Sequence, residues 1–147
     1  MTLQRMDNIL INVEDMEAAK AFFTELGMKL EGETTVEGPW ADRVVGLEGV
    51  RADIAMMVTP DGHGRVELST FERPVSATPP PRAPVNVPGI PRLTFLVDDV
   101  DEIFGRLQGH GGTLVGEIAE YEDIYRYAYV RGPAGVIVGI CQELQRA

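Results

Sequence analysis

One segment of this chain occurs twice, and this internal repeat constrains the fold more than any other feature of the sequence. Residues 6–33 align without a gap onto residues 90–117, at an offset of 84 positions. Six positions are identical in the two copies: Val13, Asp15, Gly27, Leu30, Gly32 and Glu33 match Val97, Asp99, Gly111, Leu114, Gly116 and Glu117. A segment repeated at a fixed spacing indicates two structural units of the same kind.

Each copy has the pattern of a strand, a helix and a second strand. Residues 8–13 alternate with period 2, as in a strand with two different faces. Asp15 is a suitable N-cap, and Gly27 stands where a helix often ends. Residues 28–36 are the expected next strand. In the second copy the pattern predicts strands over 92–97 and 113–120 and a helix over 99–110.

Two more strands follow in each copy, so the expected unit is βαβββ, twice. The first copy has a predicted hairpin over 51–59 and 65–71, and the second has strands over 125–131 and 136–143. Residues 38–50 have no counterpart in the second copy and include Trp40, the only tryptophan. This loop is either a lid over a pocket or a segment whose tryptophan plugs a core edge. Residues 72–89 are rich in proline and predict a stiff, extended linker.

The tandem βαβββ units resemble the vicinal oxygen chelate superfamily. Two features carry this resemblance: Val-x-Asp at both strand–helix junctions, and Gly-Pro-Ala-Gly at 132–135 before the last strand. The superfamily includes glyoxalase I, bleomycin resistance proteins and extradiol dioxygenases. The resemblance implies an α+β fold in which tandem modules form curved mixed sheets, with a ligand held between two cups. We predict a first module at 1–73, a linker at 74–89 and a second module at 90–147, together one compact domain.

The resemblance also implies where a metal would be bound, and the residues there are poor ligands. The family positions correspond to Asn8, Glu67, Arg92 and Gly139. A divalent cation needs several donor atoms that converge on one point, and only Glu67 is a usual ligand. We therefore predict no metal site and no cofactor. A divalent metal enzyme with ligands elsewhere, drawn from Glu67, Glu122, Asp123 or His63, is the less favoured alternative.

Strand alternation predicts which side chains face the ligand. In the first strand Asn8, Leu10 and Asn12 should face the cup, because Ile9, Ile11 and Val13 should pack under the helix. In the later strands we expect Ile54, Met56, Val58, Val66, Leu68, Ala128 and Val130 under the helices. The cup would then be lined by Asp53, Ala55, Met57, Glu67, Ser69, Arg92, Thr94, Leu96, Tyr125, Tyr127, Tyr129 and Cys141, with Trp40 reaching it from its loop.

The tyrosine row and two charged residues indicate which kind of ligand these positions could bind. Tyr125, Tyr127 and Tyr129 share one strand face, which suits a flat ligand or, alternatively, a ladder facing solvent or a second copy. Arg92 needs an anion, either Glu67 or a ligand carboxylate or phosphate. If Arg92 binds the ligand, a desolvated Glu67 becomes a candidate general base.

These residues are compatible with two functions. The chain either sequesters a small flat or anionic organic ligand, or catalyses metal-independent proton transfer with Glu67 as base and Arg92 or a tyrosine stabilising the oxyanion. The formal charge of −10 disfavours nucleic acid and anionic membranes as partners. A single cysteine and the lack of a long apolar segment predict a cytoplasmic protein. Open sheet edges favour a homodimer.

Overall fold

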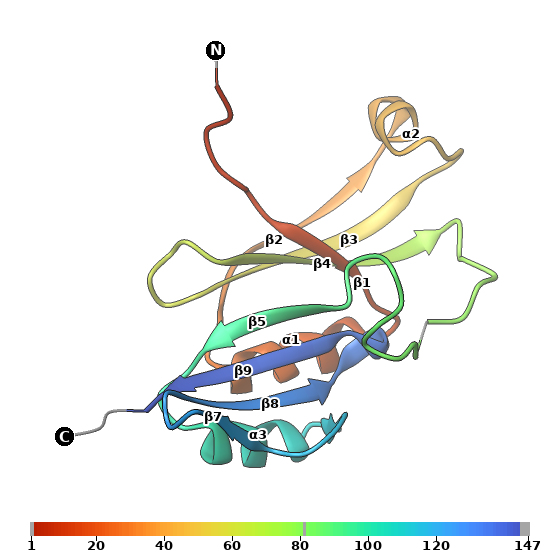
Figure 1. Cartoon of the computed structure of the whole chain (residues 1–147). Coiled ribbons are helices and arrows are strands. Elements are labelled where there is room, and N and C mark those ends of the chain that lie inside the picture. Colours follow the sequence, from red (N-terminus) through yellow and green to blue (C-terminus); the bar gives the residue numbers. More distant parts are fainter. Residues whose placement is uncertain (1, 81, 145–147) are drawn as a thin grey trace. The chain divides into compact units, whose positions relative to one another are not determined.

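The computed structural model describes residues 2–80 and 82–144, and its residues fall into two compact units. The first unit is residues 1–79 and the second is residues 80–147. Figure 1 shows that each unit has its own sheet. None of the helices in the described part of the chain is long and apolar enough to cross a membrane.

The first unit is a four-stranded mixed sheet with one helix packed on it. Its elements are β1 (Ile9–Asn12), α1 (Met16–Leu26), β2 (Lys29–Glu37), α2 (Pro39–Val45), β3 (Arg51–Val58) and β4 (Arg65–Arg73). The strand order is β1-β4-β3-β2. The outer strand β1 is parallel to β4, and the other neighbours are antiparallel.

The second unit repeats this topology. Its elements are β5 (Arg92–Leu96), α3 (Val100–Gln108), β6 (Thr113–Leu114), β7 (Ala119–Tyr121), β8 (Tyr125–Arg131), a short 3-10 turn (Pro133–Gly135) and β9 (Ile137–Glu143). The order β5-β9-β8-β6 matches that of the first unit, and β5 is parallel to β9. The α+β fold with tandem βαβββ units in curved mixed sheets is therefore confirmed.

The repeat extends to the caps of the two main helices. The Asp15 carboxylate accepts a hydrogen bond from the Ala18 amide at 3.0 Å, and the Asp99 carboxylate accepts one from the Glu102 amide at 3.1 Å. These two caps are 84 residues apart, as the alignment requires. An Asp at this position satisfies one of the amide groups that a helix start leaves without a partner.

Two segments differ from the expected secondary structure. Residues 38–50, expected to form a loop, contain the short helix α2, with Pro39 at its start and Gly46 in the left-handed conformation after its end. The Asp42 carboxylate holds the return to β3, because it accepts hydrogen bonds from the Gly49 and Val50 amides. The strand expected over 113–120 is divided into β6 and β7, and the gap between them has consequences for the site.

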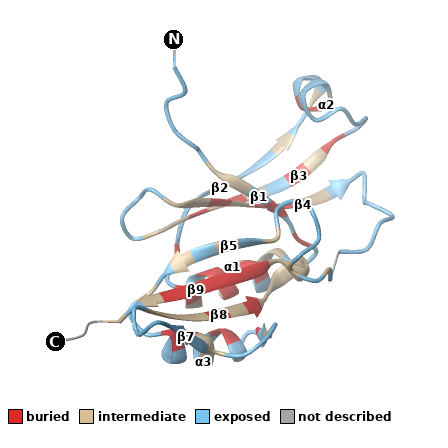
Figure 2. Cartoon of the chain, in the orientation of Figure 1, coloured by how far each residue is buried: buried red, intermediate tan, exposed pale blue. Residues whose placement is uncertain are grey.

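Many buried residues of each sheet lie on its helix side, although Ser69 and Cys141 are buried on the opposite face. In the first unit α1 contributes Ala19, Phe22, Phe23 and Leu26 to the core, and in the second unit α3 contributes Val100, Ile103 and Leu107. Figure 2 shows a continuous buried stretch along β9, which is therefore buried on both faces. The opposite face of each sheet is where a ligand would find accessible side chains.

The linker is tied to the second unit by one arginine. The Arg131 guanidinium donates hydrogen bonds to the carbonyl oxygens of Gly135, at 3.0 Å, and Ala83, at 2.9 Å. The described residues between β4 and β5 form no helix or strand, as the proline content predicts. Of the Pro79–Pro81 run, Pro81 lies outside the described residues.

Candidate functional site

The accessible face of the second sheet is fixed by the way α3 packs on the other side. The Arg126 guanidinium on β8 donates two hydrogen bonds to the Asp101 carboxylate on α3, each at 3.0 Å. This contact lowers the pKa of Asp101, because the hydrogen bond from Arg126 stabilises the carboxylate. Since strand residues alternate, the neighbours of Arg126 on β8 must point away from α3.

All four tyrosines of the chain lie on this outer face. Tyr125, Tyr127 and Tyr129 alternate along β8, and Tyr121 on β7 is the cross-strand partner of Tyr125. The Tyr125 and Tyr127 ring centroids are 5.8 Å apart with an interplanar angle of 47°. We define the tyrosine face as these four residues together with Arg92, Thr94 and Cys141, which the strand register places on the same side of the sheet.

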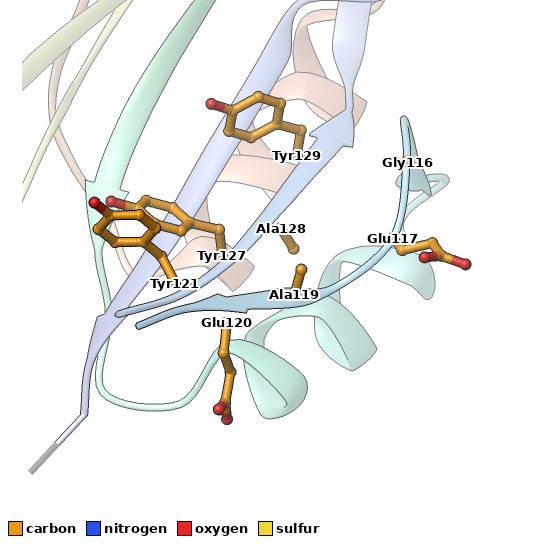
Figure 3. Close-up of a pocket in the computed structure, with 8 residues that line it drawn as sticks. All are labelled: Gly116, Glu117, Ala119, Glu120, Tyr121, Tyr127, Ala128 and Tyr129. Atoms are coloured by element: carbon orange, nitrogen blue, oxygen red, sulfur yellow. The ribbon is translucent and has the colours of Figure 1, made fainter. Parts of the chain in front are cut away.

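A pocket opens at the interruption between β6 and β7. It has a volume of about 220 Å³ and is lined by Gly116, Glu117, Ala119, Glu120, Tyr121, Tyr127, Ala128 and Tyr129. Figure 3 shows the rings of Tyr121, Tyr127 and Tyr129 on one side of β7 and β8, and the Glu120 carboxylate on the other. A gap in the sheet bordered by aromatic rings is suited to an apolar or aromatic ligand group.

Arg92 supplies the positive charge of the tyrosine face. Its guanidinium carbon lies 4.8 Å from the centroid of the Tyr129 ring, and its Nε donates to the Thr94 hydroxyl at 3.3 Å. No carboxylate among residues 82–144 forms an ion pair with Arg92. The guanidinium is therefore held by an aromatic ring while its charge remains available to an anion.

Cys141 lies beneath the tyrosine row. It is buried and is the cross-strand partner of Tyr127 on β8. Burial raises the pKa of Tyr127, and the hydrogen bond to Cys141 acts in the same direction. The Tyr127 phenol is therefore neutral at physiological pH and keeps a proton that it can donate to a ligand.

The strand registers confirm the alignment of Glu67 with Gly139. Glu67 pairs with Leu10 across β4 and β1, and Gly139 pairs with Thr94 across β9 and β5. Leu10 and Thr94 are 84 positions apart, whereas Glu67 and Gly139 are 72 apart because the first copy has additional residues before its last two strands. At Gly139 an added Cβ would lie 2.8 Å from the Thr94 hydroxyl oxygen. The second unit therefore has no room for a side chain at the position where the first unit has a carboxylate.

This close approach makes Gly139 a sensitive position. Gly139→Ala should lower the free energy of unfolding by at least about 1 kcal/mol, because the added methyl group must displace Thr94. Chemical denaturation would measure the change. Combining Gly139→Ala with Thr94→Ala should recover most of the loss, whereas simple addition of the two effects would show that Thr94 is not the obstacle.

In the first unit Glu67 lies on the sheet face away from α1. Its cross-strand neighbours are Leu10 on β1 and Met56 on β3. The next row on this face is Asn12, Ser69 and Ile54. We call these six residues the Glu67 face. Glu67 forms no hydrogen bond or ion pair with residues 2–79.

The predicted orientation of β3 is wrong. Met57 is 0% exposed and pairs with the core residue Val66, and Ala55 pairs with Leu68, so both lie on the helix side. Asp53 has the same orientation and accepts a hydrogen bond from the Thr35 hydroxyl at 3.0 Å. Ile54, Met56 and Val58 are half-buried and lie on the other face. Asp53, Ala55 and Met57 therefore do not belong to the Glu67 face.

Two other predicted ligand-binding residues lie apart from these faces. Asn8 precedes β1, and its side-chain amide donates to the Asp7 carboxylate at 2.9 Å, which lowers the pKa of Asp7. Trp40 lies on α2 and is 54% exposed. Asn12 does lie on the Glu67 face. Whether any of these side chains binds a ligand stays a prediction.

The four positions that the family resemblance assigns to a metal carry few of the donor groups that a divalent cation prefers. They hold one carboxylate, one amide already hydrogen-bonded to Asp7, one guanidinium and a glycine whose missing side chain has no space. Among residues 2–80 and 82–144 no three His, Cys, Asp or Glu side chains gather in a way that could hold a metal ion.

Tyr121 and the pocket were not predicted from the sequence. The sequence feature that could have indicated the turn before β8 is the Glu122–Asp123 pair. In the structure both residues have positive φ, 46° and 56°. Residues 122–124 form a three-residue loop that joins β7 and β8 in a tight hairpin and brings Tyr121 opposite Tyr125. An acidic pair is a weaker signal for such a turn than Asn-Gly or Asp-Gly.

Comparison with known proteins gives one family. The model of the Glyoxalase/Bleomycin resistance protein/Dioxygenase superfamily matches residues 5–140. The crystal structure of a glyoxalase family protein from Bacillus cereus is 49% identical, with a TM-score of 0.94 over 99% of this chain and 97% of that one. No curated protein sequence matches.

Two more distant structures are similar in fold alone. A glyoxalase/dioxygenase from Nostoc punctiforme is 23% identical, with a TM-score of 0.63 over 97% of this chain and 92% of its own. A glyoxylase/bleomycin resistance protein/dioxygenase domain from Frankia sp. is 15% identical, with a TM-score of 0.68 over 99% of this chain and 96% of its own.

Proposed function

We propose, from the premise that this chain belongs to the glyoxalase/bleomycin resistance protein/dioxygenase superfamily, that its tyrosine face binds a small planar organic anion. The observation that carries this proposal is the position of Arg92, held over the Tyr129 ring at 4.8 Å. No carboxylate among residues 82–144 forms an ion pair with it. Family membership by itself does not identify a ligand, so the argument depends on these side chains.

The two parts of such a ligand match two parts of the tyrosine face. A carboxylate can receive paired hydrogen bonds from the planar Arg92 guanidinium. The attached ring can stack on the row formed by Tyr125, Tyr127 and Tyr129, with the pocket at Gly116 accepting a substituent. Planar and anionic is therefore the ligand chemistry that these side chains favour.

Sequestration without turnover is the role that we favour. The four family metal positions lack a fitting donor set, and the tyrosine face needs no metal to hold an anion. A binding protein requires only a complementary surface, whereas an enzyme also needs groups placed at the reacting atoms.

Calorimetric titration of the full chain would test the proposal. Naphthalene-2-carboxylate should bind saturably and at least about tenfold more tightly than the uncharged naphthalene-2-carboxamide, which has nearly the same shape. The cationic 2-naphthylmethylammonium should bind to this face more weakly still. Equal affinity for the acid and the amide would show that Arg92 does not recognise the carboxylate. If neither compound binds, the proposal is wrong.

Proton transfer by Glu67 is the second candidate, favoured by one observation. The Glu67 carboxylate has no partner among residues 2–79 and lies between the apolar side chains of Leu10 and Met56. A base in this setting should catalyse exchange of the hydrogens next to the carbonyl of an oxoacid or thioester in D2O. Proton NMR would measure the exchange, which Glu67→Gln should abolish. No exchange by the wild type would leave sequestration as the function.

The homodimer also stays a prediction. Within their own sheets β1 and β5 are edge strands, so each has one side without a strand partner among the described residues. A second copy is one way to cover such an edge.

A further inference from the structure

The first unit contains a buried hydroxyl that has no hydrogen-bond partner. Ser69 is 1% exposed, and its Oγ atom contacts no donor or acceptor among the described residues. Buried hydroxyls are normally satisfied, because leaving one without a partner costs free energy. An exception on an otherwise well-packed strand is a place where a group from outside the chain can complete the hydrogen bond.

The Glu67 carboxylate lies on the same face, two positions away on β4. Strand alternation directs both side chains away from α1. Arg65, the preceding residue on this face, forms ion pairs with Glu31 and Asp7, so its positive charge is already paired with carboxylates other than Glu67. The Glu67 face therefore has one carboxylate and one buried hydroxyl that form no hydrogen bond with residues 2–79.

Most neighbours of these two groups are apolar, and the polar exception is Asn12 beside Ser69. Leu10 and Met56 flank Glu67 in the same row, and Ile54 flanks Ser69 in the next. An isolated carboxylate among apolar side chains favours a cationic partner that brings its own hydrogen-bond donors. The first unit as a whole adds to this preference, because residues 1–79 hold 14 Asp and Glu against 7 Lys and Arg.

We infer that Glu67 and Ser69 form a binding site for a primary ammonium group of a small organic ligand. The ammonium donates one hydrogen bond to the Glu67 carboxylate and one to the Ser69 oxygen, and the alkyl chain next to it contacts Leu10 and Met56. A primary ammonium carries three donors, so it can satisfy both oxygens at once. The inference uses the first unit alone and does not depend on the tyrosine face.

An NMR titration of the full chain with butylammonium chloride would test this site. Tetramethylammonium chloride at the same ionic strength is the matched probe, since it has the same charge but no N–H group. Butylammonium should shift the backbone amides of β1, β3 and β4 saturably and bind at least about tenfold more tightly than tetramethylammonium. Equal binding of the two cations, or no saturable shift with butylammonium, would overturn the inference.

Three variants locate the site. Glu67→Gln, which keeps the shape of the side chain, should weaken butylammonium binding at least about tenfold. Ser69→Ala should weaken it about threefold to tenfold. Glu48→Gln, an exposed carboxylate of the same unit, is the matched control and should leave the affinity unchanged. Equal effects of Glu67→Gln and Glu48→Gln would mean that only the net charge attracts the cation, against the inference.

The stability of Ser69→Ala separates a ligand-binding hydroxyl from a structural one. If the Ser69 hydroxyl has no partner until a ligand binds, Ser69→Ala should melt at the same temperature as the wild type or higher, because it removes an unsatisfied buried group. A lower melting temperature would show that the hydroxyl already has a partner in the free protein, and Ser69 would then be excluded from the site. Thermal unfolding without ligand measures this difference.

Discussion

Met57→Ala should lower the free energy of unfolding by about 2–5 kcal/mol, the usual cost of truncating a fully buried methionine. Met57 is 0% exposed and lies on the helix side of β3, where its cross-strand neighbour is the core residue Val66. Its side chain is enclosed by the sheet and α1, so its loss leaves a cavity. Urea denaturation of the two proteins would measure the difference.

The neighbouring residue provides the control. Met56 has the same side chain, is half-buried and points to the opposite face, toward Glu67. Met56→Ala should therefore cost less than about 1 kcal/mol, because its neighbours are already partly open to solvent. The contrast between two adjacent methionines depends only on which face each one occupies. A larger loss for Met56 than for Met57 would mean that the strand has the opposite orientation.

These two residues also show why sequence alone could not orient β3. Residues 54–58 are Ile, Ala, Met, Met and Val, so both faces are apolar and period-2 alternation carries no contrast. The polar residue at the start, Asp53, suggested the wrong phase, although the Thr35 hydroxyl satisfies it on the helix side. The orientation is set by the register with β4, where Leu68 and Val66 are core residues. A register depends on contacts between strands and is absent from a single strand's pattern.

Other features were predictable because their signals are local. The Asp15 and Asp99 caps lie at the start of their helices, and β5 alternates between polar and apolar residues from Arg92 to Phe95. The tyrosine row was visible for the same reason, since Tyr125, Tyr127 and Tyr129 follow each other at spacing two on one strand.

The pocket was not predictable, because it results from a departure from the repeat. Gly32 and Gly116 are equivalent in the alignment, yet β2 continues past Gly32 through a bulge, whereas its counterpart stops after Leu114 and resumes at Ala119. The sequence shows that the two copies share these glycines but not that their strands differ. The gap depends on how many residues of β6 and β7 pair with β8, and this pairing is a property of the folded sheet.

Arg92→Ala should weaken the binding of naphthalene-2-carboxylate about 10- to 100-fold, if the tyrosine face binds a planar anion. A hydrogen bond to a charged group contributes about 1.5–3 kcal/mol, and alanine removes both the charge and the guanidinium fork. The affinity for naphthalene-2-carboxamide should change little, since the amide makes no ion pair. Raising the salt concentration should weaken the wild-type complex more than the variant complex. Calorimetry of both ligands with both proteins would measure this coupling.

Two further substitutions distinguish the guanidinium from a positive charge in general. Arg92→Lys keeps the charge but loses the planar fork and the stacking on Tyr129, so its affinity should lie between those of the wild type and Arg92→Ala. Arg106→Ala removes an arginine of α3 whose partner is Glu102, and it should leave binding unchanged. If Arg106→Ala weakens binding as much as Arg92→Ala, the anion responds to the net charge of the protein, and the tyrosine face is not its site. If only Arg92 matters, the anion lies against Tyr129, where the ring already holds the guanidinium in place.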